Sequence, residues 1–129
     1  GSEMCIRDSY LGCAAVLGLM KEPQRALLAS DRAVALAPDS VRVRLYRAVI
    51  RRNAGDFAGA LADLELVFRE TPTTEQPWHE RGLCRCEVGE LDGAVTDLER
   101  ALELAVPERR AIVQARLDEV RAIRASRRQ

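Results

Sequence analysis

Two stretches of the chain repeat each other: GDFAGALADLE at residues 55–65 and GELDGAVTDLE at residues 89–99. Set 34 residues apart, the two stretches share both glycines, the alanine after the second glycine and the final Asp-Leu-Glu, and Asp56 stands opposite Glu90. The agreement continues upstream, where Arg47 matches Arg81. A fixed period of this length is typical of repeat proteins, in which each repeat is one supersecondary unit.

A third, more divergent copy precedes these two, with Ala26 and Pro38 at matching places. The predicted repeats are therefore 7–40, 41–74 and 75–108. Because one repeat cannot bury its apolar face alone, neighbouring repeats must stack. The repeats therefore predict the fold of the whole domain.

Each repeat is predicted to form two antiparallel helices joined by a short turn. In the second repeat the helical pattern covers 41–54, stops at Gly55 and resumes as far as Phe68. The third repeat stops likewise at Gly89, since glycine commonly ends helices. Aromatic residues are only 4% of the chain, while Ala, Leu, Arg and Glu are abundant, which favours helices over sheets. The predicted fold class is all-α.

These repeats resemble the tetratricopeptide repeat, which places Trp, Leu-Gly, Tyr, Ala, Phe, Ala and Pro at fixed positions within 34 residues. The matching residues are Trp78, Gly82, Ala94, Leu98 and Ala101 in the third repeat, Ala48, Ala60, Leu64 and Pro72 in the second, and Tyr10, Ala14, Ala26, Ala33 and Pro38 in the first. The resemblance implies a right-handed α-α superhelix of three helical hairpins plus a C-terminal capping helix. Another helical-hairpin repeat is the alternative.

In that family the first helix of each hairpin lines a concave groove that holds a peptide or a partner helix. By this register the expected partner-binding residues are Arg42, Leu45, Tyr46, Val49, Arg52 and Asn53, then Gln76, His79, Glu80, Leu83, Cys86 and Glu87, with Leu11 and Ala15 in the first repeat. Some family members also clamp the C-terminal carboxylate of chaperones with Lys, Asn and Arg. The corresponding places here hold no cation, so no affinity for an acidic chaperone tail is expected.

Two departures from the family pattern occur together. Where the first helix carries Arg47 or Arg81 in place of leucine, the second helix of the same repeat carries Asp63 or Asp97. In the first repeat the two places are apolar. We therefore predict that Arg47 pairs with Asp63 and that Arg81 pairs with Asp97; four separately solvated charges are the alternative. Arg51 and Arg85, at the usual tyrosine position, are further departures.

The two ends of the chain differ from the repeats. Residues 1–9, GSEMCIRDS, show no helical period and resemble cloning or adapter sequence, so a non-native or disordered leader is expected before a repeat domain at 10–126. On that interpretation we expect the chain to be a C-terminal fragment of a longer protein; a native but irregular leader is the alternative. A helix is predicted over 108–126, with Val113, Leu117, Val120 and Ile123 on one face, and we interpret it as the capping helix. The first repeat, left uncapped, could mediate self-association.

Composition excludes several kinds of chemistry. The chain holds 20 basic and 20 acidic residues, one histidine and no glycine-rich phosphate loop, so we expect no enzyme activity, no cofactor and no metal site. The four cysteines form no zinc or disulfide pattern. No membrane span or secretory signal is evident, which favours the cytoplasm, and the preference for arginine over lysine suggests a bacterial, GC-rich genome.

Charge is balanced overall but not locally. Residues 75–108 hold three arginines against nine carboxylates, whereas 109–129 hold seven against two. A nucleic-acid or acidic-surface binder is therefore one alternative function, although nucleic acid is the weaker reading because pairing with the third repeat also explains the cations. The arginines concerned are Arg109, Arg110, Arg121, Arg124, Arg127 and Arg128. The other alternative is the non-catalytic tail of a larger enzyme or regulator. The leading prediction remains a protein-interaction scaffold.

Overall fold

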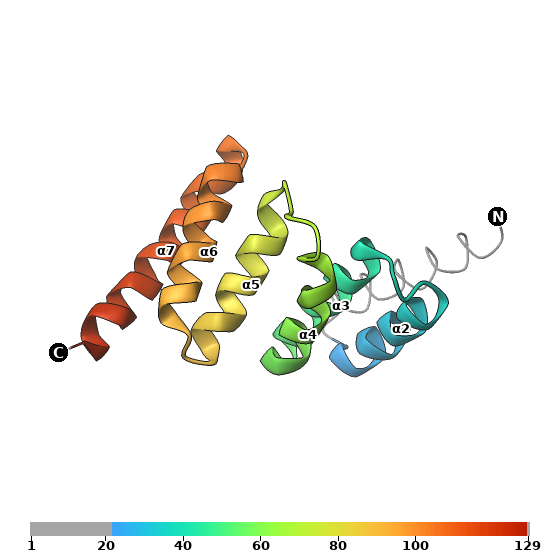
Figure 1. The fold of residues 1–129 in the computed structure, drawn as a ribbon. Helices are drawn as coiled ribbons and strands as arrows, with labels where there is room; N and C mark the ends of the chain where they lie inside the picture. The colour runs from blue at the N-terminus through green and yellow to red at the C-terminus, as the bar shows by residue number, and fades with distance from the viewer. Residues whose placement is uncertain (1–21, 129) are drawn as a thin grey trace. The chain divides into compact units, whose positions relative to one another are not determined.

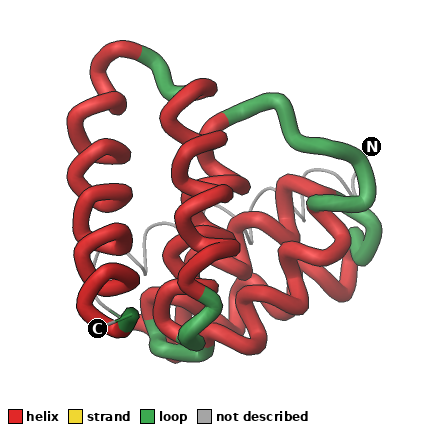
Figure 2. The backbone as a smooth tube through the Cα atoms, turned by 60° about the vertical axis from the view of Figure 1, so that its left-hand side comes forward, coloured by secondary structure: helices red, strands yellow, loops and turns green. Residues whose placement is uncertain are grey.

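The computed structural model describes residues 22–128, and every regular element in that range is an α-helix (Figure 1, Figure 2). The all-α prediction is confirmed. The chain divides into two compact units, Gly1–Arg69 and Glu70–Gln129, here called unit 1 and unit 2. The leader 1–9 and the predicted first helix of the first repeat lie outside the described residues. The helices are α2 (Pro23–Leu36), α3 (Val41–Asn53), α4 (Phe57–Val67), α5 (Glu75–Glu87), α6 (Leu91–Leu104) and α7 (Pro107–Arg127).

The turns inside the hairpins α3–α4 and α5–α6 are built alike. Gly55 and Gly89 adopt φ of 86° and 90°, the left-handed region that favours glycine. The amides that follow return to the preceding helix, with Asp56 N donating to Arg51 O at 2.8 Å and Glu90 N to Arg85 O at 2.8 Å. This hydrogen-bond pattern ends a helix and reverses the chain at once, so each hairpin is antiparallel.

Unit 1 packs α2 on α3 and α3 on α4. Two small apolar clusters join α2 to α3, one around Ala26 and Ile50 and the other around Ala33 and Val43. The alanines let the two backbones approach closely, while Val43 is fully buried. Helix α3 therefore has a fixed face toward each of its neighbours.

Unit 2 places α5, α6 and α7 side by side with alternating directions (Figure 1). Its core lies on α6, where Leu98 is fully buried. Helices α5 and α6 approach closely at Gly82, where an added Cβ would lie 2.9 Å from Leu98 Cγ. Trp78 packs against the core cluster formed by Ala101, Ala105 and Val113. It also donates its indole N–H to Pro72 O at 3.0 Å, which ties α5 to the preceding loop.

Helix α7 covers α6 with Val113, Leu117 and Val120, which are all buried. Pro107 starts the helix at a position where its missing N–H costs nothing. The prediction for Ile123 is wrong, because this side chain is 39% exposed. The buried apolar stripe of α7 ends at Val120, and the last two turns carry Arg121, Arg124 and Arg127.

Candidate functional site

In the hairpin α3–α4 one buried carboxylate accepts hydrogen bonds from three arginines. Asp63 on α4 is 1% exposed, and Arg47 on α3 donates Nη2–H to its Oδ1 at 2.8 Å and Nε–H to its Oδ2 at 3.0 Å. Arg44 and Arg51, one turn to either side, reach the same carboxylate at 3.3 and 3.1 Å. The charge is buried but fully surrounded by donors, which is the condition under which a buried carboxylate is tolerated.

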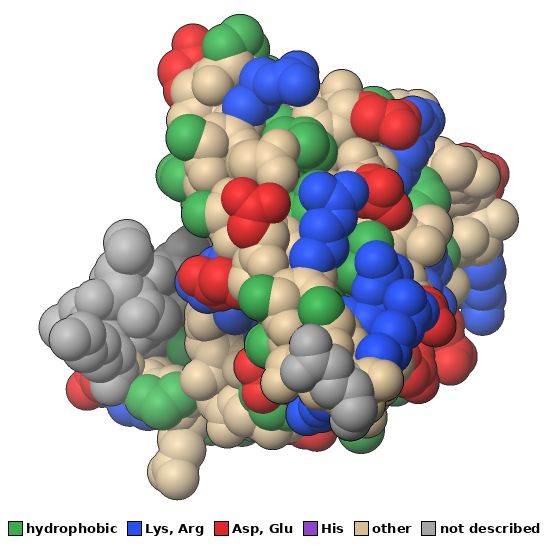
Figure 3. Space-filling model, turned by 90° about the vertical axis from the view of Figure 1, so that its left-hand side faces the viewer, with side chains coloured by type: hydrophobic (Ala, Val, Ile, Leu, Met, Phe, Trp, Pro, Cys, Tyr) green, Lys and Arg blue, Asp and Glu red, His purple; other side chains and the backbone are tan. Residues whose placement is uncertain are grey.

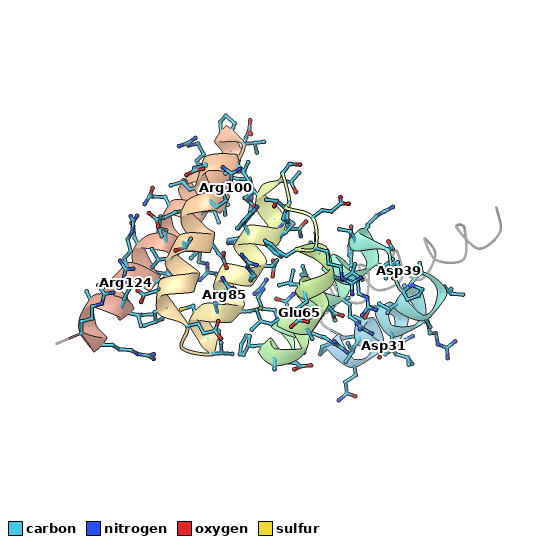
Figure 4. All side chains as sticks on the ribbon, viewed as in Figure 1. Asp31, Asp39, Glu65, Arg85, Arg100 and Arg124 are labelled. Carbon is cyan, nitrogen blue, oxygen red and sulfur yellow. The ribbon has the colours of Figure 1, made fainter. Side chains whose placement is uncertain are left out.

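Arg47 also links α3 to α2. Its Nη1–H donates to Oδ1 of Asp31 at 3.1 Å. The accepting Asp31 side chain, labelled in Figure 4, is half-exposed. Hydrogen bonding to Asp63 is the main cause that raises the pKa of the Arg47 guanidinium above its usual value, and Asp31 adds to it against the opposing effect of burial. The guanidinium therefore stays charged at every physiological pH.

The hairpin α5–α6 repeats the arrangement with two arginines. Arg81 donates Nε–H and Nη2–H to the two oxygens of Asp97, both at 2.9 Å, and Arg85, which is labelled in Figure 4, adds a third bond at 3.0 Å. Asp97 is 1% exposed. The Arg81 guanidinium also stacks 5.2 Å from the centre of the Trp78 ring, a cation–π contact.

The predicted pairs thus lie inside larger networks than the sequence indicated. Arg51 and Arg85 were noted only as departures from the family pattern, and Arg44 was not singled out. Their spacing from Arg47 and Arg81, three or four residues along one helix, was the available signal. Each network joins the two helices of its hairpin and thereby constrains how the first helix is rotated about its axis relative to the second.

On α3 the predicted partner-binding residues lie on the face opposite the arginines that bind Asp63. Arg42, Tyr46 and Asn53 are exposed, with Tyr46 at 38%. Leu45, Val49 and Arg52 are half-buried between them. Steps of three or four residues lead from Arg42 to Leu45 or Tyr46, then to Val49, and then to Arg52 or Asn53, so these residues form one stripe along the helix, here called the α3 stripe.

On α5 the predicted residues divide. Gln76 and Glu87 are exposed, and Leu83 and Cys86 are half-buried; these four are here called the α5 stripe. His79 and Glu80 are only 9% and 5% exposed. Burial removes His79 and Glu80 from the set of side chains that a partner can reach, because spacing along a helix does not reveal which neighbours cover a residue.

Cys86 is a poor nucleophile. Burial is the largest cause that raises the pKa of its thiol, the Glu87 carboxylate raises it further, and Arg127 opposes them. The thiol is accordingly protonated at neutral pH, and reactivity requires the thiolate. Among residues 22–128 no cluster of His, Cys, Asp and Glu has the makings of a metal site.

Most of the C-terminal arginines are engaged with carboxylates of unit 2. Arg109 binds Glu75 at 2.9 Å, Arg121 binds Glu99 at 3.2 Å, and Arg124 and Arg128 share Asp92 at 3.3 and 3.0 Å. Acidic and basic side chains are interspersed on the face seen in Figure 3. Such neutralisation leaves few cations for phosphate, which weakens the nucleic-acid alternative. Within the described range no helix has the length and apolar character to cross a bilayer.

Comparison by sequence finds no matching family model and no matching curated protein. Comparison by structure finds many similar chains. The first TPR domain of Spaghetti (RPAP3), bound to the HSP90 peptide SRMEEVD, has a TM-score of 0.82 at 18% identity, covering 93% of this chain and 94% of that one. The Sgt2 TPR domain of Aspergillus fumigatus gives 0.81 at 21% identity, covering 95% and 82%. An O-GlcNAc transferase of Thermobaculum terrenum gives 0.83 at 18% identity, covering 93% of this chain and 23% of that one.

The networks make a prediction about stability. In the set Arg81→Ala, Asp97→Ala and the double variant, each single change should destabilise unit 2 by about 3 kcal/mol, because it strands a buried charge. The double variant should cost about 2 kcal/mol less than the sum of the two single changes. Chemical denaturation followed by circular dichroism measures these free energies.

The matched control is the exposed pair Arg100 and Glu103 on α6, which stands 2.6 Å apart. Its coupling energy should be below about 0.5 kcal/mol, as for most surface ion pairs. If the losses for Arg81 and Asp97 are additive within error, the two residues are not coupled and the network has no structural role.

Proposed function

Because the chain has the fold of the tetratricopeptide repeat, we propose that it is a protein-interaction module that binds a peptide or a partner helix on the α3 stripe of unit 1, with the α5 stripe of unit 2 as a second candidate surface. The observation that carries the proposal is the two-sided character of α3. One face is fixed by three arginines on Asp63, and the opposite face presents Tyr46 with half-buried Leu45 and Val49 beside it. An amphipathic aromatic side chain on a rigid support is a frequent anchor in protein interfaces.

The charges of the stripes favour a partner of mixed charge. The α3 stripe carries Arg42 and Arg52, whereas the α5 stripe carries Glu87. Acidic residues beside apolar anchors would complement the α3 stripe and basic residues would complement the α5 stripe, so an amphipathic or extended segment that carries both signs suits either surface better than a uniformly charged one. The stripes are short, so we expect micromolar affinity, about −8 kcal/mol.

The proposal includes no catalytic role for the described residues. Asp63 and Asp97, two of the buried carboxylates that could otherwise act as acids or bases, are each neutralised by a bidentate arginine. The histidine at position 79 is buried. A general acid or base must be able to approach its substrate within hydrogen-bond distance and to donate or accept a proton there.

The stripes can be tested by selecting peptides on the intact chain from a phage-displayed library. The double variant Tyr46→Ala with Leu83→Ala should bind a selected peptide about tenfold or more weakly, because it removes both apolar anchors. Leu28→Ala is the matched control, since Leu28 is 56% exposed on α2, and it should leave the affinity unchanged. Thermal unfolding of all three proteins checks the fold. Equal affinity for the double variant and the original chain would place the peptide elsewhere.

A second expectation concerns the acidic peptide bound by the similar RPAP3 domain. The places that a carboxylate clamp would occupy hold Tyr46, Gln76 and buried Glu80, which offer no cation and one like charge. Isothermal titration of the intact chain with SRMEEVD should therefore give no measurable heat of binding. Binding that disappears when the peptide's C-terminus is amidated would contradict this expectation and establish a clamp.

A further inference from the structure

One side of α7 carries an ordered set of exposed residues that neither the core nor the proposed stripes use. Ile112, Arg116, Glu119 and Ile123 follow one another at steps of four, three and four residues, so they form a single line beside the face that packs on α6. The isoleucines are 49% and 39% exposed. The side chains of Arg116 and Glu119 are 53% and 61% exposed and stand 3.2 Å apart.

This line, here called the α7 line, is complementary to itself when reversed. Read from the N-terminal end it runs apolar, basic, acidic, apolar, and read from the other end apolar, acidic, basic, apolar, with the same spacing. Two antiparallel copies would therefore set Ile112 against Ile123 and Arg116 against Glu119, twice over. A two-fold interface demands this reciprocity, because residue i must suit residue j on both subunits.

We propose that the α7 line is a docking surface for a second copy of this chain, paired through antiparallel α7 helices. The four-three-four spacing is the one that places side chains in the seam between two helices. The two central ion pairs fix the antiparallel direction and register, since a shifted or parallel pairing would oppose like charges or leave an isoleucine against a charge. This surface is distinct from the α3 and α5 stripes, so its failure would leave the proposed function standing.

The simplest alternative explanation of the α7 line is that Arg116 and Glu119 form an ordinary solvent-exposed ion pair within one helix. It explains Arg116 and Glu119, but it gives no reason for a large apolar residue four positions before and four positions after the pair. The line spans 12 residues from Ile112 to Ile123, about 16 Å of helix, which is small for an interface. The dimer is accordingly weak, with a dissociation constant of about 100 µM.

Two charge reversals on the intact chain test the pairing. Arg116→Glu makes the centre of the line wholly acidic, and Glu119→Arg makes it wholly basic, so each variant alone should repel its own copy. Sedimentation velocity over a concentration series should show the original chain dimerising and each variant at least about tenfold weaker. An equimolar mixture of the two variants should associate again, because the acidic centre of one meets the basic centre of the other.

Arg110→Glu and Asp118→Arg are the controls, with the same changes of charge at exposed positions of α7 that lie off the line. They should dimerise like the original chain, and circular dichroism should show all five proteins equally helical. Three outcomes would overturn the proposal: an original chain that is monomeric throughout, variants that associate as strongly as it does, or a mixture that associates no better than its components. Association that survives both reversals belongs to another surface, such as residues 7–20.

Discussion

The burial of one carboxylate in each of the hairpins α3–α4 and α5–α6 is the constraint on which their geometry depends. Asp63 and Asp97 are almost inaccessible to water, and a lone charge at such a site would cost several kcal/mol. The cost is offset because Arg47 and Arg81 meet both carboxylate oxygens at 2.8–3.2 Å. A bidentate pair has one favourable geometry, so it determines the rotation of the first helix and not only its proximity.

That rotation determines which residues remain outside. With Arg44, Arg47 and Arg51 turned toward α4, the opposite side of α3 presents Tyr46 and its neighbours. In the family pattern, packing of leucine and tyrosine at the positions of Arg47 and Arg51 would hold the helix. A bidentate arginine–carboxylate pair is more directional than apolar packing, because it requires two aligned hydrogen bonds. We infer that the ionic contacts at these positions, in place of apolar ones, determine which residues of α3 and α5 face outward as the two stripes.

Much of this architecture is accessible from the sequence, because the repeat supplies its own comparison. Arg47 with Asp63 and Arg81 with Asp97 change together between repeats of one chain, and Gly55 and Gly89 mark the turns. The additional arginines of the networks could not be predicted in this way. When one carboxylate accepts hydrogen bonds from several arginines, the arginines and the carboxylate do not change together one for one between repeats. Periodicity likewise could not show that His79 and Glu80 are buried or that Ile123 is exposed, because all three fit the helical spacing equally well.

The most direct test of the central claim is nuclear magnetic resonance of the arginine Nε–H groups in the ¹⁵N-labelled chain. Arg47 and Arg81 donate these protons to the buried carboxylates, so their signals should be shifted and should exchange with water far more slowly than that of Arg25, whose side chain is 71% exposed. Asp63→Asn and Asp97→Asn should each speed exchange only in their own hairpin. Exchange at Arg47 and Arg81 as fast as at Arg25 would contradict the account.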